Sequence, residues 1–198
     1  MKLVLATRNA AKLEELRRIL APLVAVEVVG LDDVPPYEEV PETGATFEEN
    51  ALIKAREAVL RTGLPAVADD SGLTVAALNG MPGVLSARWA GSAASDEANL
   101  RLLLEQIADV PDSRRAATFE CAAVLVTPSG AEQVAHGTMS GRLLRAPRGS
   151  NGFGYDPIFV PDGDTRTTAE MTAAEKDAIS HRGRAFRTLA PLIATTLT

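Results

Sequence analysis

Two adjacent carboxylates, Asp69 and Asp70, are the residues of this chain best placed to do chemistry. They follow the apolar residues 66–68, which predict a short buried strand, and precede Ser71-Gly72, which predicts the turn that ends it. Open α/β sheets bind their ligands at the carboxyl ends of strands, and successive side chains of a strand point to opposite faces. We therefore expect these carboxylates to line a site and to have different tasks. A solvated Asp-Asp-Ser-Gly turn is the structural alternative.

A polar turn near the amino terminus predicts an anion site. The segment Thr7-Arg8-Asn9-Ala10-Ala11-Lys12 joins a predicted strand, residues 2–6, to an amphipathic helix with apolar residues at helical spacing. The amino terminus of a helix carries free backbone N–H groups and the positive end of the helix dipole, so it suits an anion. The turn lacks the glycines of a Walker A loop. Asn9 also fits a purely structural role as the helix cap.

An acidic loop and a second helix come next. Residues 32–43 are rich in proline and acids, which is typical of a solvated surface segment; the functional alternative is that Glu42 binds a metal ion. A capping box at residues 46–49 predicts a helix to about residue 61, on which Asn50 and Lys54 lie one turn apart. Because this helix leads directly into the Asp69-Asp70 strand, we expect Lys54 to face the same site.

The last third of the chain contains a glycine-flanked aromatic loop and a cluster of cations. Glycines at positions 149, 152 and 154 allow close approach of a ligand, and Phe153 can then stack on a nucleobase; a mobile hairpin loop is the structural alternative. A capping box places Lys176 in the first turn of a short helix, and His181 and Arg182 open the closing helix. Cations oppose the dipole there, so they indicate a ligand rich in oxygen.

Composition narrows the class of protein. The chain of 198 residues is 46% hydrophobic with a net charge of −6, which predicts one globular domain, residues 1–198, and disfavours coating of nucleic-acid polymers. No apolar run is long enough to span a membrane. The single cysteine, Cys121, lies in an apolar run and is interpreted as a core thiol; with no signal sequence, we expect a cytoplasmic protein.

Residues 116–127 and 132–143 predict a long hairpin that extends the sheet or forms a dimer edge.

Five motifs occur in order along the chain: Thr7-x-Asn9-x-x-Lys12, Phe47-x-Glu49-Asn50-Ala51-x-x-Lys54-Ala55, Asp69-Asp70-Ser71-Gly72-Leu73, Phe153-Gly154-Tyr155-Asp156-Pro157 and Ser180-His181-Arg182. With these motifs the sequence resembles the inosine triphosphate pyrophosphatase family over essentially its whole length. It is most similar to the bacterial branch, which clears dITP, ITP and XTP. Each motif is modest alone, and the order and spacing of all five make the resemblance specific. Arg8 stands where many relatives have a glycine.

The resemblance implies a fold, a reaction and a set of roles. The fold is mixed α/β, a long twisted central sheet with flanking helices in two lobes around a cleft, in a homodimer. The reaction converts a purine nucleoside triphosphate to the monophosphate and pyrophosphate with Mg²⁺ as cofactor. Asp70 matches the catalytic carboxylate that also binds the metal, with Glu42 as second metal ligand. The triphosphate loop matches Thr7, Arg8, Asn9, Ala10, Ala11 and Lys12. Phosphate contacts match Lys54 and Ser71, and base or nucleotide contacts match Phe153, Gly154, Tyr155, Asp156, Lys176, His181 and Arg182.

Elementary chemistry agrees with these roles. A triphosphate carries about four negative charges, which an acidic protein can hold with clustered lysines, helix amides and Mg²⁺. Hypoxanthine and xanthine carry an oxygen at C6 where adenine has an amino group, so donors such as His181 and Arg182 would favour them. Three alternatives stay open: a Maf-type pyrophosphatase acting on pyrimidine or canonical nucleotides, a nucleotide sensor without catalysis, and an interaction module using the hairpin.

Overall fold

The computed structural model describes residues 2–38 and 40–197. Its strands are β1 Lys2–Leu5, β2 Glu27–Val29, β3 Ala66–Val75, β4 Ala116–Val126, β5 Glu132–Leu143 and β6 Phe159–Pro161. Its α-helices are α1 Ala10–Leu20, α2 Phe47–Thr62, α3 Asp96–Gln106, α4 Ala173–Ile179 and α5 His181–Thr196. Within the described ranges, no helix combines the length and the apolar character needed to cross a membrane.

The chain divides into two compact units. Unit 1 comprises Met1–Asp70, Cys121–Gly137 and Arg182–Thr198, and unit 2 comprises Ser71–Glu120 and Thr138–His181. The chain passes from one unit to the other after residues 70, 120, 137 and 181. Strands β3, β4 and β5 therefore each contribute residues to both units. Neither unit is a continuous stretch of sequence.

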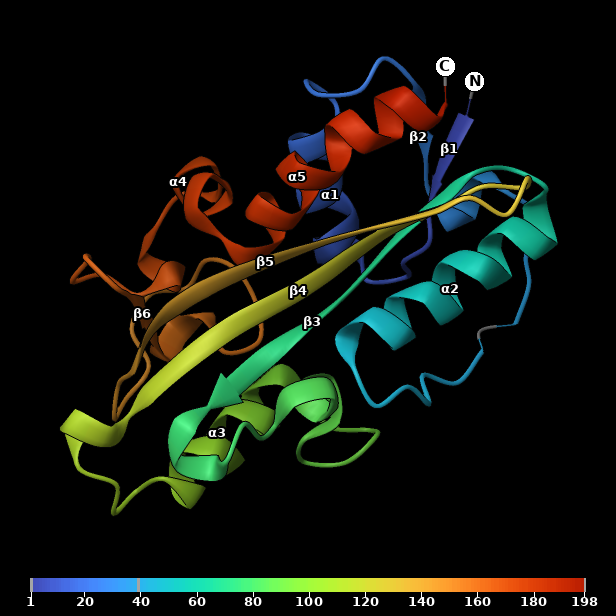
Figure 1. Cartoon of the computed structure of the whole chain (residues 1–198). Helices are drawn as coiled ribbons and strands as arrows, with labels where there is room; N and C mark the ends of the chain where they lie inside the picture. Colours follow the sequence, from blue (N-terminus) through green and yellow to red (C-terminus); the bar gives the residue numbers. More distant parts are fainter. Residues whose placement is uncertain (1, 39, 198) are drawn as a thin grey trace. The chain divides into compact units, whose positions relative to one another are not determined.

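Unit 1 is a sheet covered by helices on both faces. Its strand order is β2-β1-β3-β4-β5, and β1 runs parallel to both neighbours. Helices α1 and α5 cover one face and α2 covers the other (Figure 1). Alternation along β3 divides its side chains between these layers: Val67 packs with α1 and α5, while Ala66 and Ala68 pack with the alanines of α2. The alternation sets the direction of the two carboxylates that follow.

Short-range signals place the helices of unit 1. The Asn9 side chain accepts a hydrogen bond from the Lys12 amide at 3.1 Å and caps α1. The Thr46 hydroxyl accepts from the Glu49 amide at 3.1 Å and caps α2. Gly63 ends α2 with a φ of 67°, a left-handed conformation that glycine adopts at little cost. These caps confirm the start predicted for each helix.

Unit 2 has the strand order β3-β4-β5-β6, in which β6 pairs antiparallel with β5. Its core gathers side chains from α3 and the strands, among them Leu103, Phe119 and Phe159. The structure thus contains parallel and antiparallel pairs in a mixed α/β arrangement with flanking helices, and this confirms the predicted fold class.

The course of β3 corrects one sequence-based expectation. Ser71-Gly72 does not end the strand, because β3 continues to Val75. Leu73 and Val75 are fully buried in the core of unit 2, and this packing outweighs the turn preference of Ser-Gly. Asp69 and Asp70 therefore lie inside a ten-residue strand. The strand end beside them belongs to β1, whose last register partner on β3 is Val67.

Candidate active site

Asp70 projects from β3 toward α2, and two side chains of that helix meet it. Asn50 Nδ2 donates to Asp70 Oδ2 at 3.1 Å, and Lys54 Nζ lies 3.5 Å from Asp70 Oδ1. Asp70 is only 7% exposed. Burial raises the pKa of Asp70, and the nearby charge of Glu42 adds to that rise, while Lys54 and Lys12 oppose it. The result is a carboxylate with increased proton affinity, as a general base requires.

Glu42 reaches the same ammonium from the acidic loop. Its Oε1 lies 2.7 Å from Lys54 Nζ, so one cation is shared by the carboxylates of Glu42 and Asp70. Burial by itself would lower the pKa of Lys54, but the charges of Asp70, Asp69 and Glu42 outweigh it and raise that pKa. Glu42, Lys54 and Asp70 therefore lie together in unit 1, and their roles in binding and catalysis stay predictions.

Asp69 projects from the opposite face of β3, as the alternation requires. Its Oδ2 lies 3.3 Å from Lys12 Nζ on α1 and accepts a hydrogen bond from Arg182 Nε on α5 at 3.1 Å. Burial alone would raise the pKa of Asp69, but Lys12, Arg182 and Lys54 together hold it far below its usual range. The low pKa of Asp69 therefore favours its charged form, which pairs with two cations.

Arg182 joins Asp69 to a second buried acid. Its Nη1 donates to Glu15 Oε2 on α1 at 2.7 Å, and its own side chain is only 2% exposed. The other oxygen of Glu15, Oε1, is buried and has no hydrogen-bond partner among the described residues. Burial by itself would lower the pKa of Arg182, but the carboxylates of Asp69 and Glu15 outweigh it and raise that pKa. The structure thus places Arg182 in a buried ion-pair network that also fixes Lys12.

The turn predicted to bind phosphate has defined internal contacts. Thr7 Oγ1 accepts from the Asn9 amide at 3.2 Å, and Ala10 and Ala11 open α1. Arg8 donates from Nη2 to the carbonyl oxygen of Tyr37 at 2.5 Å, and its guanidinium lies 5.8 Å from the centre of that ring. Arg8 thereby ties this turn to the loop that carries Glu42.

A second group of predicted residues lies in unit 2, around Asp156. Asp156 Oδ2 accepts from Lys176 Nζ at 2.5 Å and from the Phe153 amide at 2.9 Å, while Oδ1 accepts from Thr168 Oγ1 at 2.8 Å. Lys176 Nζ also lies 4.9 Å from the centre of the Phe153 ring. Gly152, with a φ of 74°, passes so close to Asp156 that a Cβ there would collide with its carboxylate. Asp156 therefore organises the aromatic loop.

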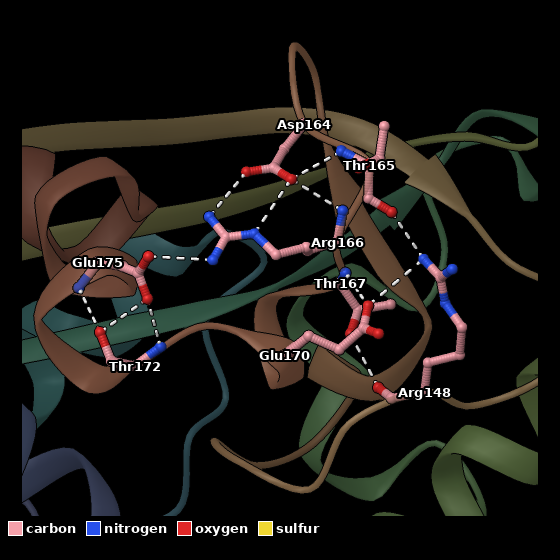
Figure 2. A network of polar contacts seen from close by, with 8 residues as sticks. All are labelled: Arg148, Asp164, Thr165, Arg166, Thr167, Glu170, Thr172 and Glu175. Carbon is pink, nitrogen blue, oxygen red and sulfur yellow. Dashed lines mark hydrogen bonds and ion pairs between the residues drawn. The ribbon is translucent and has the colours of Figure 1, made fainter.

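The segment before α4 fixes the position of Lys176. Figure 2 shows the Arg166 guanidinium between the carboxylates of Asp164 and Glu175. Glu175 also accepts from the Thr172 backbone at 2.8 Å, completing the predicted capping box. Hydrogen bonds from Thr172 and Arg166 lower the pKa of Glu175 to about 2. This network anchors a helix of only seven residues, which carries Lys176.

The remaining predicted residues of unit 2 occupy different surroundings. Tyr155 is buried and donates its hydroxyl to the Ser86 carbonyl at 2.8 Å, and Gly154 donates its amide to Asp96 Oδ2 at 2.8 Å. His181 is buried with its ring stacked on Phe119, 4.8 Å between centres. Ser71 directly follows Asp70 on β3 and is half-buried. Their roles in binding stay predictions.

Sequence reasoning missed two members of the unit 1 site. Asn50 was placed next to Lys54 by helical spacing but was not assigned to Asp70. Glu15 gave a weak signal, because it lies one turn after Lys12 on α1, and its partner Arg182 is 167 positions away. Spacing within one helix could have identified Asn50; the pairing of Glu15 required the fold.

Comparisons with known proteins agree over the whole chain. A family model described as the Ham1 family matches residues 3–192. A dITP/XTP pyrophosphatase of Nocardia farcinica is 62% identical over 195 residues, which is 98% of this chain and 95% of that protein. A dITP/XTP pyrophosphatase of Frankia alni is 63% identical over 204 residues, covering all of both chains.

Solved structures of related proteins also resemble this chain over nearly its whole length. A nucleoside-triphosphatase, also named dITP/XTP pyrophosphatase, from Mycobacterium abscessus is 62% identical with a TM-score of 0.78, covering 96% of this chain and 100% of that one. A HAM1 protein from Coxiella burnetii is 45% identical with a TM-score of 0.87, covering 98% of each chain.

Proposed function

This chain belongs to the Ham1 family, and from that premise we propose that it hydrolyses non-canonical purine nucleoside triphosphates to the monophosphate and pyrophosphate. Its substrates are dITP, ITP and XTP. The relatives named dITP/XTP pyrophosphatase support the reaction. The observation that carries it is the setting of Asp70, a buried carboxylate of raised pKa held between Asn50 and Lys54.

The acids of unit 1 fit a divalent cation. Asp70 and Glu42 already share one cation, the ammonium of Lys54, so their carboxylates converge on a point that attracts positive charge. Carboxylate oxygens are the ligands that Mg²⁺ prefers, and Mg²⁺ is commonly held by one or two of them together with water and substrate phosphates. Asp70 and Glu42 would hold Mg²⁺ here. When bound, the ion supplies charge neutralisation on the phosphates.

The chain's own residues supply the rest of the reaction. A water oxygen forms a bond to the α-phosphorus, the bond from that phosphorus to the α–β bridging oxygen breaks, and pyrophosphate leaves with the electron pair. Asp70 accepts the proton of the attacking water, a task that its raised pKa favours. Lys54 stabilises the charge that develops on the phosphates.

The remaining triphosphate charge is assigned to the amino-terminal end of α1. Lys12 is held by Asp69 with its side chain 16% exposed, and the amides of Ala10 and Ala11 begin the helix beside it. Helix amino termini and lysines together form a typical phosphate site. Thr7, Arg8 and Asn9 shape this turn, and Ser71 is proposed as a further phosphate contact.

The purine is assigned to the group in unit 2. Phe153 is half-buried, its backbone amide donates to Asp156, and the Lys176 ammonium lies close to its ring. Stacking on an aromatic ring is a common way to bind a base. Gly154, Tyr155 and His181 are proposed as further contacts to the nucleotide. Arg182 belongs to unit 1, where its guanidinium is bound by Asp69 and Glu15. A cytoplasmic homodimer is proposed for the assembly.

A substrate panel tests this function. Pyrophosphate release is measured with Mg²⁺ from dITP, ITP, XTP, ATP, GTP and the pyrimidine triphosphates. We expect kcat/KM for dITP, ITP and XTP to exceed that for ATP by about 10²-fold or more, since donors facing C6 leave the adenine amino group unpaired. Chelation of the metal should abolish release. Preference for a pyrimidine would favour the Maf-type reading, and binding without turnover would favour a sensor.

A further inference from the structure

Asn50 connects two segments of the unit 1 site through one buried amide. Its side chain is fully buried on α2. Nδ2 donates to Asp70 Oδ2 at 3.1 Å, and Oδ1 accepts from the Gly44 amide at 2.8 Å. We propose that Asn50 is a positioning residue for the hydrolysis, a clamp that holds the Glu42 loop and the Asp70 carboxylate in one fixed arrangement. This inference rests on the proposed function of the site.

The loop side of the clamp is tightly fitted. Gly44 lies so close to α2 that an added Cβ would be 2.6 Å from Glu49 Cβ and 2.7 Å from Asn50 Oδ1. The next amide, of Ala45, donates to Glu49 Oε2 at 2.6 Å. The loop is therefore docked on the first turns of α2. Because Glu42 lies two residues before Gly44, this docking determines where its carboxylate can reach.

The strand side of the clamp depends on the Asn50 side-chain NH₂ group, which donates to Asp70. Asp70 faces Asn50 and Lys54, which lie one turn apart on α2, so the carboxylate is held by two groups of one rigid element. A flipped Asn50 amide would place its oxygen against the Asp70 carboxylate and its NH₂ against the Gly44 N–H. Both contacts would repel, so the two partners together determine the orientation of the amide.

The clamp matters for the reaction because both acids must act on one substrate phosphate. A displacement of about 1 Å at a reacting group can cost about 10²-fold in rate. Asn50 contacts Asp70 and the loop backbone, and we assign it no phosphate contact. Its loss is therefore expected to lower kcat more than it changes KM.

Two variants separate the halves of the clamp. Asn50→Ala removes the donor and the acceptor, and we expect kcat for dITP to fall about 10²-fold with KM changed less than about threefold. Gly44→Ala keeps the Asn50 donor but forces the loop away from α2. In both variants, hydrogen exchange of backbone amides at residues 42–46, measured without metal or nucleotide, should accelerate about tenfold or more.

Asn99 provides a matched control in unit 2. It is also buried on a helix, accepting from the Ala90 amide at 2.7 Å and donating to the Ala87 carbonyl at 3.2 Å. Asn99→Ala should cost similar stability and leave kcat and exchange at residues 42–46 unchanged.

Three results would overturn the proposal: normal kcat in Asn50→Ala, unchanged exchange at residues 42–46, or an equal loss of kcat in Asn99→Ala. If the wild-type protein releases no pyrophosphate, the proposed function fails. In that case the exchange data still test whether Asn50 holds the loop. Faster exchange at residues 42–46 in Asn50→Ala would support the clamp, and unchanged exchange would contradict it.

Discussion

Asp69 and Asp70 are chemically identical neighbours that the fold makes into opposite kinds of acid. Strand alternation directs Asp69 toward Lys12 and Arg182, whose charges lower its pKa. It directs Asp70 toward α2, where burial dominates and raises its pKa. The fold stabilises the charge on Asp69 and disfavours the charge on Asp70. The acid proposed as the general base is thus the one whose charge the fold destabilises, as expected where activity is gained at the expense of stability.

This difference predicts opposite stability effects of two matched substitutions. Asp69→Asn leaves Lys12 and Arg182 without their shared anion and should cost about 3 kcal/mol or more at pH 7. Asp70→Asn removes a buried charge and should raise Tm by about 2–4 °C at pH 7. Thermal unfolding of both variants and of the wild type measures whether each substitution raises or lowers Tm. Stabilisation by Asp69→Asn, or destabilisation by Asp70→Asn, would contradict the account.

The same difference sets the pH dependence of the Asp70→Asn effect. A raised folded pKa means that the native state binds its proton more tightly than the unfolded chain, so ionisation of Asp70 lowers stability as pH rises through that pKa. The advantage of Asp70→Asn is therefore present above the folded pKa. It should vanish as pH falls toward the unfolded value of about 3.9. An advantage independent of pH would point to a cause other than the charge.

At the scale of elements, Arg115 shows how a buried cation can hold a helix end by hydrogen bonds to carbonyl oxygens. Its guanidinium, 2% exposed, donates to the carbonyl oxygens of Ile107 at the end of α3, Leu143 on β5 and Leu144. These acceptors come from two segments of unit 2, the end of α3 and the end of β5. Burial lowers the pKa of Arg115, and the charge of Arg145 adds to that effect.

Replacing Arg115 should therefore destabilise the protein more than replacing an exposed arginine of the same region. We expect Arg115→Met to cost about 3 kcal/mol, since the carbonyl oxygens of Ile107, Leu143 and Leu144 each lose the bond to Arg115. The exposed Arg101→Met on α3 serves as control and should change stability by about 0.5 kcal/mol or less. Chemical denaturation of both variants compares them. Equal midpoints would show that Arg115 contributes only packing.

At the scale of elements, the sequence predicted short-range features and missed long-range ones. Local rules gave the caps at Asn9, Thr46 and Thr172, because each depends on residues within one turn. They failed at Ser71-Gly72, where burial of the following residues extends β3. The pairing of Asp69 with Arg182 spans 113 positions, and no local pattern encodes it. The members of the site could be found from motifs, but their division between the two faces of β3 needed the fold.

At the scale of the whole molecule, the interleaved chain path predicts cooperative unfolding. Three strands contribute to both units, and the chain passes between them four times. A strand that loses its pairing in one unit is continuous with the pairing in the other. We therefore expect the chain to unfold as the single domain predicted from its composition.

Two natural probes can test this cooperativity. The only cysteine, Cys121, is buried in unit 1, and the only tryptophan, Trp89, is half-buried in unit 2, where its Nε1 donates to Gln106. Thiol accessibility and tryptophan fluorescence should give the same denaturant midpoint. Separate midpoints would mean that the units unfold independently.

The central claim concerns the carboxylate of Asp70, and single-turnover pyrophosphate release from dITP by Asp70→Asn tests it most directly. The variant should fold with normal or higher Tm and bind the nucleotide, and its rate should fall by about 10²- to 10⁴-fold. A folded variant that releases pyrophosphate at close to the wild-type rate would remove Asp70 from the mechanism and contradict the account.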